Sequence, residues 1–383
     1  MNISMLLSLY EMKVHFPLRF AFYSKIFKVE KNRILFADPY KTDLTDNMIP
    51  LYTALSKQDG VTLIKCFPKS DGLKGNSKID KIKGRLNRTI AFNKFIKEYS
   101  RCGVVFLTES YLPAYAVTPR PDTKVVQLWH GSGAFKKWGY STLNKSFGAN
   151  DNKIPMHNCY SLIPVSSAEV IPHWAEAFAC KKEIIKPLGV PRTDELFEDH
   201  NYKENFLSEH PEFKDKKLIL YAPTFRGNTI TAAKNGVSLD IEKLHKNLGD
   251  DYALLLRLHP FIKQKFDIPE SCKGFCLDAS PYETNFCLEI SDILITDYSS
   301  IIFEWSLLEK PIIFFSPDLD DYKDNRDFYY TYEDFVPGPI VKAQDELKAA
   351  IEIADKSKIK AFKEKFMNAC DGHSTEKIIK ELF

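Results

Sequence analysis

The chain has 383 residues, of which 44% are apolar and 27% charged, and its formal net charge is +2. This length predicts two globular α/β domains rather than one. The near-neutral charge, with no dominant basic stripe, excludes general nucleic-acid binding. The eight cysteines form no CxxC pair, so they indicate buried thiols in a reducing compartment rather than a zinc site.

The N-terminal residues 1–28 are predicted to be a leader. Met1 to Phe20 is apolar and basic, but Glu11, Lys13 and Arg19 interrupt it, so it is too broken for a membrane-spanning helix. A docked or disordered leader is favoured, and an amphipathic helix at a membrane surface is the alternative.

Strands and helices then alternate, which is typical of a parallel, doubly wound sheet. Helices are expected near 87–99 and 168–178, and a charged domain linker near 194–216. The strands of a first domain, residues 29–200, are expected at 33–37, 61–67, 103–107, 124–129, 160–165 and 183–185.

Alternation restarts in a second domain, residues 201–383. Further helices are expected at 345–354 and 358–369. The strands of this domain are expected at 217–222, 252–258, 275–277, 293–295 and 311–315.

The stretch Leu294 to Trp305 predicts a strand, a phosphate-sized turn and a helix. The turn is Asp297-Tyr298-Ser299-Ser300. A helix start carries unpaired N–H groups and the positive end of the helix dipole, so it attracts phosphate. The alternative is an ordinary capped helix.

Polar side chains gather where the predicted strands end, which is where ligands bind in open α/β sheets. One histidine follows a strand in each half, and Gly131 would let a ligand approach the backbone closely. This pattern favours an interdomain active site for phosphoryl or glycosyl transfer, with histidine taking a proton and cations stabilising a leaving phosphate. The strand-end residues are His130, Ser132, Thr224, Arg226, Arg257, His259, Asp297, Ser299 and Ser300.

Two further groups have two interpretations each. Lys136 and Lys137 either meet phosphate or form a solvated pair. Glu304 either hydrogen-bonds a ribose or is one more surface glutamate. The acidic run from Asp318 to Asp324 is interpreted as a solvated loop, and no metal cluster, Walker lysine motif, GxGxxG fingerprint or GxSxG elbow is present.

An ordered set of motifs resembles the CDP-glycerol glycerophosphotransferases, which prime and polymerise teichoic acids and related capsule polymers. Gln127 to Gly133, followed by Lys136-Lys137-Trp138-Gly139, is similar to that family's WHGT-x-x-K-K-x-G signature. The resemblance continues over about residues 30 to 383 through GVPRTD at 189–194, YAPTFR at 221–226, RLHP at 257–260, TDYSS at 296–300, DLDDY at 318–322, RDFY at 326–329 and DG at 371–372.

The resemblance implies a GT-B fold, that is, two Rossmann-like domains with parallel sheets facing an interdomain cleft. It implies transfer of a polyol-phosphate, glycerol-phosphate first, from a CDP-activated donor to a hydroxyl of a lipid-linked or polymeric acceptor, with release of CMP and with no metal or other cofactor. By motif, His130 matches the general base and His259 the histidine near the donor diphosphate. Asp297, Tyr298, Ser299 and Ser300 match the donor-phosphate turn. The family's place of work implies a peripheral protein at the cytoplasmic face of the cell membrane, and basic residues at 356–365 would assist attachment.

The chain departs from the signature at two points. Ser132 replaces the usual threonine, and three residues rather than two separate it from the lysine pair. Primase or polymerase, teichoic acid or capsule, and glycerol or ribitol all stay open. The rival predictions are a GT-B glycosyltransferase that uses a nucleotide sugar and a nucleotide-binding scaffold protein without catalysis.

Overall fold

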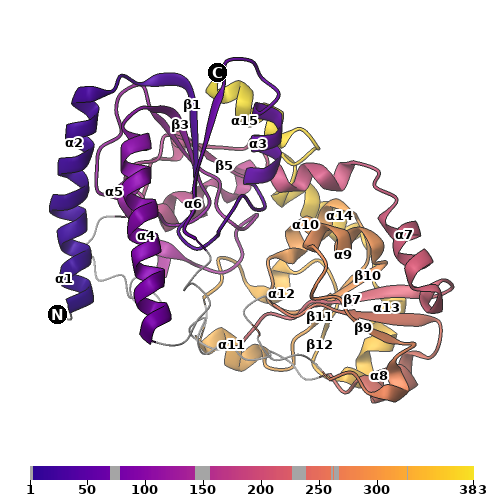
Figure 1. Cartoon of the computed structure of the whole chain (residues 1–383). Coiled ribbons are helices and arrows are strands. Elements are labelled where there is room, and N and C mark those ends of the chain that lie inside the picture. The colour runs from indigo at the N-terminus through magenta and orange to yellow at the C-terminus, as the bar shows by residue number, and fades with distance from the viewer. Residues whose placement is uncertain are drawn as a thin grey trace. The chain divides into compact units, whose positions relative to one another are not determined.

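The chain forms two compact units in the computed structural model (Figure 1), which describes residues 3–69, 78–142, 156–226, 239–259, 262, 267–325 and 327–383. The first unit contains Met1–Gly131, Trp138–Asp194 and Ala369–Phe383, and the second contains Ser132–Lys137 and Glu195–Asn368. The units therefore differ from the predicted ranges 29–200 and 201–383, because two segments belong to the unit that is distant in sequence.

The first unit is built on a parallel sheet with the strand order β2-β1-β3-β4. A bridge from Val126 to Leu162 continues the pairing toward β5, which pairs with β6. Buried apolar runs such as Val104 to Leu107 form these strands, as expected for a sheet covered on both faces. The strands are β1 (Glu30–Ala37), β2 (Thr62–Cys66), β3 (Cys102–Leu107), β4 (Lys124–Gln127), β5 (Ile163–Pro164) and β6 (Ile185–Lys186).

Helices cover both faces of this sheet, with α3 and α15 on one side and α2 and α4 on the other (Figure 1). Ile378 and Leu382 of α15 join the same buried cluster as Phe36 and Leu51, so the C-terminal helix completes the core of the first unit. The helices of this unit are α1 (Ile3–Tyr10), α2 (Phe16–Ile26), α3 (Met48–Leu55), α4 (Lys78–Tyr99), α5 (Leu112–Tyr115), α6 (Ile171–Phe178) and α15 (Ser374–Leu382).

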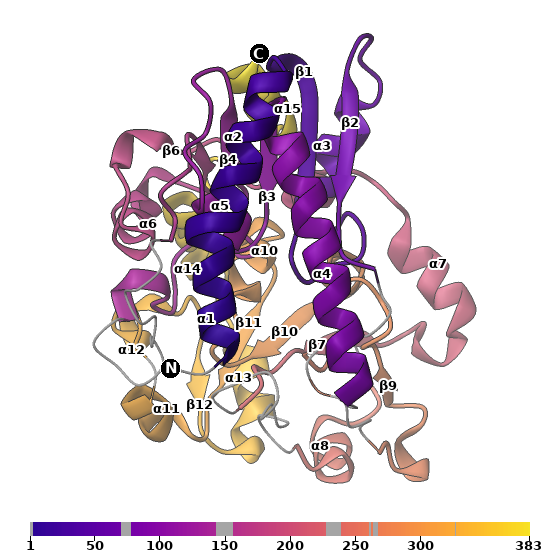
Figure 2. The ribbon, with the colours of Figure 1, turned by 60° about the vertical axis from the view of Figure 1, so that its left-hand side comes forward.

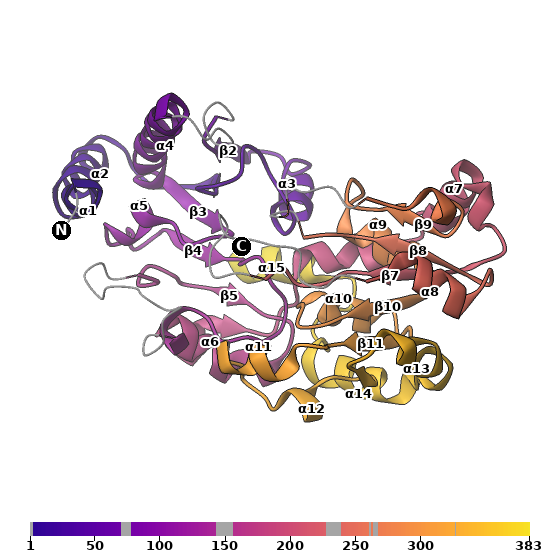
Figure 3. The same cartoon turned by 90° about the horizontal axis from the view of Figure 1, so that it is seen from below.

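The predicted leader is helical and docked. A π-helical turn, Glu11–His15, joins α1 to α2, and α2 lies beside α4 (Figures 2 and 3). Phe16 is fully buried and meets Phe92 edge-on at 6.2 Å, while His15 hydrogen-bonds Asn93 at 3.0 Å. Within the described residues, no helix is long and apolar enough to cross a membrane.

The second unit is built on a parallel sheet with the order β12-β11-β10-β7-β8-β9. Read from β9, this is the Rossmann order 3-2-1-4-5-6, which reverses direction between β7 and β10. The sequence predicted all of these strands except β12. They are β7 (Lys217–Tyr221), β8 (Tyr252–Leu256), β9 (Cys276–Asp278), β10 (Ile293–Thr296), β11 (Ile312–Phe315) and β12 (Ile340–Val341).

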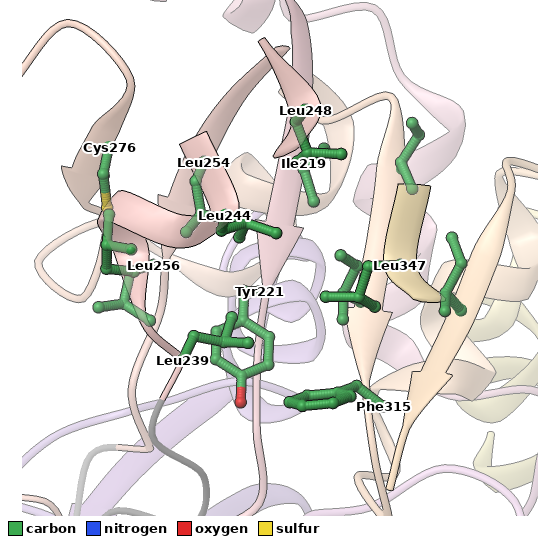
Figure 4. Close-up of a cluster of buried hydrophobic side chains, with 14 of the residues drawn as sticks. Ile219, Tyr221, Leu239, Leu244, Leu248, Leu254, Leu256, Cys276, Phe315 and Leu347 are labelled. Carbon is green, nitrogen blue, oxygen red and sulfur yellow. The ribbon is translucent and has the colours of Figure 1, made fainter. Parts of the chain in front are cut away.

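Helices also cover both faces of the second sheet, with α9, α10 and α14 on one side and α8 and α13 on the other (Figure 1). Figure 4 shows the core beneath α8 and α13, where Leu244 and Leu347 meet Tyr221, Leu256 and Phe315 of the sheet. The helices are α7 (Tyr202–Glu209), α8 (Ile241–Leu248), α9 (Thr284–Ile290), α10 (Ile301–Leu307), α11 (Leu319–Asn325), α12 (Tyr332–Phe335), α13 (Leu347–Ile353) and α14 (Lys356–Phe366). Two parallel α/β units confirm the predicted fold class.

The charged segment that was predicted to be a linker is folded. It contains α7, whose Phe206 is buried and meets Phe286 of α9 edge-on at 6.2 Å. Charged residues dominate this helix because only one face of it is covered, which is why the sequence resembled a linker.

Candidate active site

The switch point of the second sheet brings two of the predicted motifs together. β7 ends before Thr224 and β10 ends before Asp297, at the two strands between which the order reverses. The Asp297 carboxylate is 1% exposed and accepts hydrogen bonds from the backbone N–H groups of Thr224 (2.8 Å) and Tyr298 (2.6 Å). This is the position where an open α/β sheet binds its ligand.

Arg226 is enclosed rather than open to a ligand. Its guanidinium binds Asp318 through two hydrogen bonds (2.7 and 2.9 Å) and lies 2.9 Å from Asp297 Oδ2. It also lies 5.0 and 5.1 Å from the ring centroids of Tyr298 and Tyr322, which stack on each other. Although burial opposes the shift, Arg226 lowers the pKa of Asp318. The two carboxylates offset the arginine charge, and the predicted contact of Arg226 with substrate stays a prediction. Asp318 is bound to Arg226, so it is not part of a solvated loop.

Two cations act on His259, which follows β8. Burial, together with the nearby positive charges of Lys136 and Arg257, lowers the pKa of His259 to about 4, so the ring is neutral at pH 7. Its ring lies 4.8 Å from that of Phe225. Lys136 and Arg257 would attract a bound anion, and the anion would in turn favour the charged form of the imidazole.

Arg257 also shapes the loop after β9. Its guanidinium donates to the carbonyl oxygens of Ser280 (3.3 Å) and Tyr282 (2.6 Å) and to the Thr284 hydroxyl (2.8 Å). These bonds fix the guanidinium in place, and its charge still acts on His259.

The predicted phosphate turn leads into a helix, as expected. Ser299 and Ser300 are partly exposed, and α10 begins at Ile301, whose N–H donates weakly to Ser299 Oγ at 3.4 Å. Tyr298 is fully buried instead and donates to Asp318 (3.0 Å). Donor binding by this turn stays a prediction.

Ser132 and Glu304 bind each other. The Ser132 hydroxyl donates to Glu304 Oε1 at 2.6 Å, and both residues are 4% exposed. Glu304 is therefore not a surface glutamate, and its predicted ribose contact stays a prediction.

The segment Ser132–Lys137 is built into the second unit. Phe135 lies between aromatic rings, with Phe335 stacked at 4.7 Å, and Lys136 pairs with Phe328 in an antiparallel bridge. Gly133 has a φ of +65°, and a Cβ there would lie 2.1 Å from Phe303. Gly131, which the sequence singled out, has only ordinary contacts around it. Gly133 is thus the structurally required glycine, whereas a Cβ would fit at Gly131, and the predicted approach of a ligand there stays a prediction.

In the first unit, three polar side chains follow neighbouring strands. Asp38 follows β1 and accepts the Thr108 hydroxyl at 2.6 Å, at the point where the order β2-β1-β3-β4 reverses. Glu109 follows β3, and its Oε1 lies 2.9 Å from Nδ1 of His130, which follows β4. The His130 side chain is 52% exposed, so the ring is accessible to solvent.

The backbone before His130 is held in an unusual conformation. Trp129 has a φ of +55°, in the left-handed region that non-glycine residues rarely adopt. Asn47 donates to its carbonyl (3.0 Å), and the Gln127 side chain accepts its N–H (3.0 Å). Such strain is maintained only where neighbours fix the backbone, and it concentrates at functional sites.

Sequence reasoning missed Asp38, Glu109 and Asn47. Asp38 directly follows the last residue of β1, and Glu109 follows β3 after Thr108. The strand-end rule that selected His130 would therefore have found both residues. Asn47 precedes α3 and is distant in sequence from the loop it supports, so no local pattern marks it.

One other motif of the resemblance has a structural role. The Asp194 carboxylate accepts the N–H groups of Ser374 (2.9 Å) and Thr375 (2.8 Å) and so caps α15. Two residues of the other motifs, Pro260 and Arg326, lie outside the described residues. No group of three or more metal-binding side chains occurs within the residues that the structure describes.

Comparison with known proteins places this chain in a family. A family model described as CDP-glycerol:poly(glycerophosphate) glycerophosphotransferase matches residues 19–383. The teichoic acid ribitol-phosphate primase of Bacillus spizizenii is 37% identical over 369 residues, which cover 93% of this chain and 92% of that protein. The poly(ribitol-phosphate) polymerase of the same organism is 35% identical over 365 residues, and the chain spans only 57% of its length.

The fold has a solved counterpart as well. The wall teichoic acid polymerase TagF aligns with a TM-score of 0.73 and 23% identity, over 95% of this chain and 92% of that one. This likeness supports the GT-B type predicted from the motifs. By its family match and its alignment with nearly the whole length of the primase, the chain belongs to the CDP-glycerol:poly(glycerophosphate) glycerophosphotransferase family.

Proposed function

We propose that this protein transfers a polyol-phosphate from a CDP-activated donor to an acceptor hydroxyl in teichoic acid synthesis, with release of CMP. The observation that carries the proposal is the family match over residues 19–383. The site fits this chemistry, since each unit places a histidine after a strand of a parallel sheet.

The donor side of the proposal rests on the second unit. The Rossmann order puts the turn after Asp297 at the switch point, and the cations Lys136 and Arg257 act on the neutral ring of His259. A diphosphate bound there would raise the pKa of His259 from about 4, because an anion favours the charged imidazolium. Ser300→Ala should weaken donor binding, and an unchanged donor KM would count against the phosphate-turn assignment.

The acceptor side rests on His130. The acceptor hydroxyl attacks the β-phosphorus, its proton passes to His130, the new P–O bond forms, and the bond to the CMP phosphate breaks. Positioning and electrostatics supply most of the acceleration in phosphoryl transfer. His130→Ala should lower turnover by about 10²-fold or more and leave donor binding largely intact. Turnover close to normal would refute the assignment of His130.

Ribitol-phosphate is the polyol we propose to test first. The sequence resemblance favoured glycerol-phosphate, but both relatives described above are ribitol enzymes by name. Both are named as teichoic acid enzymes, and neither is named for capsule synthesis. We therefore propose transfer of ribitol-phosphate to a lipid-linked or polymeric acceptor, in teichoic acid rather than capsule synthesis.

Nucleotide release tests the reaction class. Purified protein is incubated with a synthetic lipid-linked acceptor and, in turn, CDP-ribitol, CDP-glycerol and UDP-sugars. CMP that appears only with acceptor and one CDP-polyol supports the proposal and identifies the donor. UDP released from a sugar donor instead favours the rival glycosyltransferase, and donor binding without turnover favours a scaffold protein.

We also propose that the first unit attaches to the surface of the membrane, at its cytoplasmic face. Two neighbouring helices each carry a row of exposed apolar side chains at helical spacing, which is typical of interfacial helices. Basic residues such as Arg19 and Lys25 accompany the row on α2. The rows are Tyr10, Val14, Leu18, Phe22 and Ile26 on α1 to α2, and Ile79, Ile82, Leu86 and Ile90 on α4.

Co-sedimentation with vesicles tests this attachment. Leu18→Glu with Phe22→Glu should reduce binding to vesicles that contain anionic lipid, because two exposed apolar contacts are replaced by repelled charges. Ile353→Glu, at a 73% exposed apolar residue of α13 in the other unit, is the matched control. Equal binding of the double variant and the wild type would refute the attachment through α2.

A further inference from the structure

We propose that Glu109 is a positioning residue for His130, an inference that rests on the proposed function. Glu109 Oε1 lies 2.9 Å from His130 Nδ1, and the carboxylate is 24% exposed. A carboxylate only accepts hydrogen bonds at neutral pH, so Nδ1 must be the ring nitrogen that carries the proton. The proton-accepting nitrogen is then Nε2, on the opposite edge of a half-exposed ring.

The surroundings hold this pair in one geometry. The Trp129 ring stacks on the His130 ring with centroids 4.4 Å apart and planes inclined by 29°. Arg192 Nη1 donates to the His130 carbonyl at 2.8 Å, which fixes the backbone. Gln127 Nε2 donates to the Glu109 carbonyl at 3.2 Å, which ties the ends of β3 and β4 together. The plane of the His130 ring, the backbone of His130 and the backbone of Glu109 are therefore each constrained by a separate contact.

This geometry serves proton transfer in two ways. Before reaction it selects the tautomer whose Nε2 lone pair can accept the proton of the acceptor hydroxyl. As the oxygen–phosphorus bond forms and the bond to CMP breaks, that proton moves to Nε2 and the ring becomes an imidazolium. The Glu109 carboxylate then forms a charge-assisted hydrogen bond to the imidazolium, which is stronger than the neutral one. The pair thus stabilises the transition state more than the ground state.

Kinetics of two Glu109 variants test this role. Glu109→Ala removes the hydrogen-bond acceptor, whereas Glu109→Gln removes only the charge, and both should lower kcat. For Glu109→Ala we expect a loss of about ten- to a hundredfold, which is the range for losing a hydrogen bond to a charged group. The donor KM should stay within about twofold, because Glu109 acts through His130. Glu30→Gln is the matched control, since Glu30 is a surface carboxylate of the same unit that pairs with Arg101.

A spectroscopic measurement tests the pairing without any substrate. In protein with 15N-labelled histidine, the His130 signals are identified by their loss in His130→Asn, among the nine histidines of the chain. We expect the Nδ1–H tautomer in the wild type and a shift toward the Nε2–H tautomer in Glu109→Ala, with no shift in Glu30→Gln.

The outcomes separate the two proposals. An unchanged tautomer in Glu109→Ala overturns the pairing, and an unchanged kcat overturns the positioning role. A wild-type protein that releases no nucleotide from any donor overturns the proposed function, and the tautomer measurement still decides whether Glu109 orients the ring.

Discussion

Two glycines of one motif should respond in opposite ways to the same substitution. At Gly133 an alanine would adopt a φ of +65° and place its Cβ 2.1 Å from the ring of Phe303. The left-handed backbone costs about 1–2 kcal/mol for a non-glycine residue, and the overpacking adds about 1–3 kcal/mol. At Gly131 the nearest atom to the new Cβ is 3.9 Å away, on Trp129, and the backbone is unstrained. We therefore expect Gly133→Ala to lower the free energy of unfolding by about 2–5 kcal/mol and Gly131→Ala to leave it almost unchanged.

Thermal unfolding of the two variants measures the difference. In a unit of about this size, 1 kcal/mol shifts Tm by roughly 2–4 °C, so Gly133→Ala should lower Tm by roughly 4–20 °C. Gly131→Ala should unfold like the wild type and instead lose turnover, if a substrate approaches the backbone there. Equal Tm values for the two variants would refute the argument from the contact with Phe303.

The remaining predictions concern three other contacts. Ser132→Ala removes a hydrogen bond from the buried Glu304 carboxylate, so the free energy of unfolding measured in urea should fall by about 1–3 kcal/mol. Ser132→Thr keeps the hydroxyl and should be as stable as the wild type. Asp194→Ala removes the cap of two N–H groups at the start of α15, which should cost about 0.5–2 kcal/mol; an unchanged urea midpoint would contradict the capping role. Burial lowers the pKa of His157 to about 4, whereas an unfolded histidine titrates near 6.5. The unfolded state therefore binds more protons between these pH values, and stability falls as pH is lowered through the window. His157→Asn should make that fall shallower, and a pH dependence identical to the wild type's would refute it.

The sheets could be predicted because their strands are buried on both faces. Runs such as Ile293 to Thr296 are short and almost entirely apolar, a pattern typical of a strand covered on both sides. β12 escaped prediction because two residues, Ile340 and Val341, form no recognisable run. The leader helices α1 and α2 were ambiguous because their apolar residues divide between a buried side, such as Phe16, and an exposed side, such as Phe22.

The site could be predicted in outline but not in its pairings. The strand-end rule identified His130, Thr224 and Asp297 because it depends only on where strands stop. It gave no information on which charges offset one another, so the pairing of Arg226 with Asp318 was not predicted. That pairing joins residues 92 positions apart in sequence, and only the folded β7 and β11 bring them together.

The place of α15 sets the order in which this protein can fold during translation. Its Ile378 and Leu382 belong to the core of the first unit, whose other members lie before residue 195. A ribosome must therefore synthesise the whole second unit before the first can close its apolar face. Until then α3 and the sheet behind it expose a surface that chaperones recognise, and nascent chains of this kind are prone to aggregate. A fragment that stops near residue 200 would share that defect permanently, so the first unit is best studied with the last helix supplied as a separate peptide or joined by circular permutation.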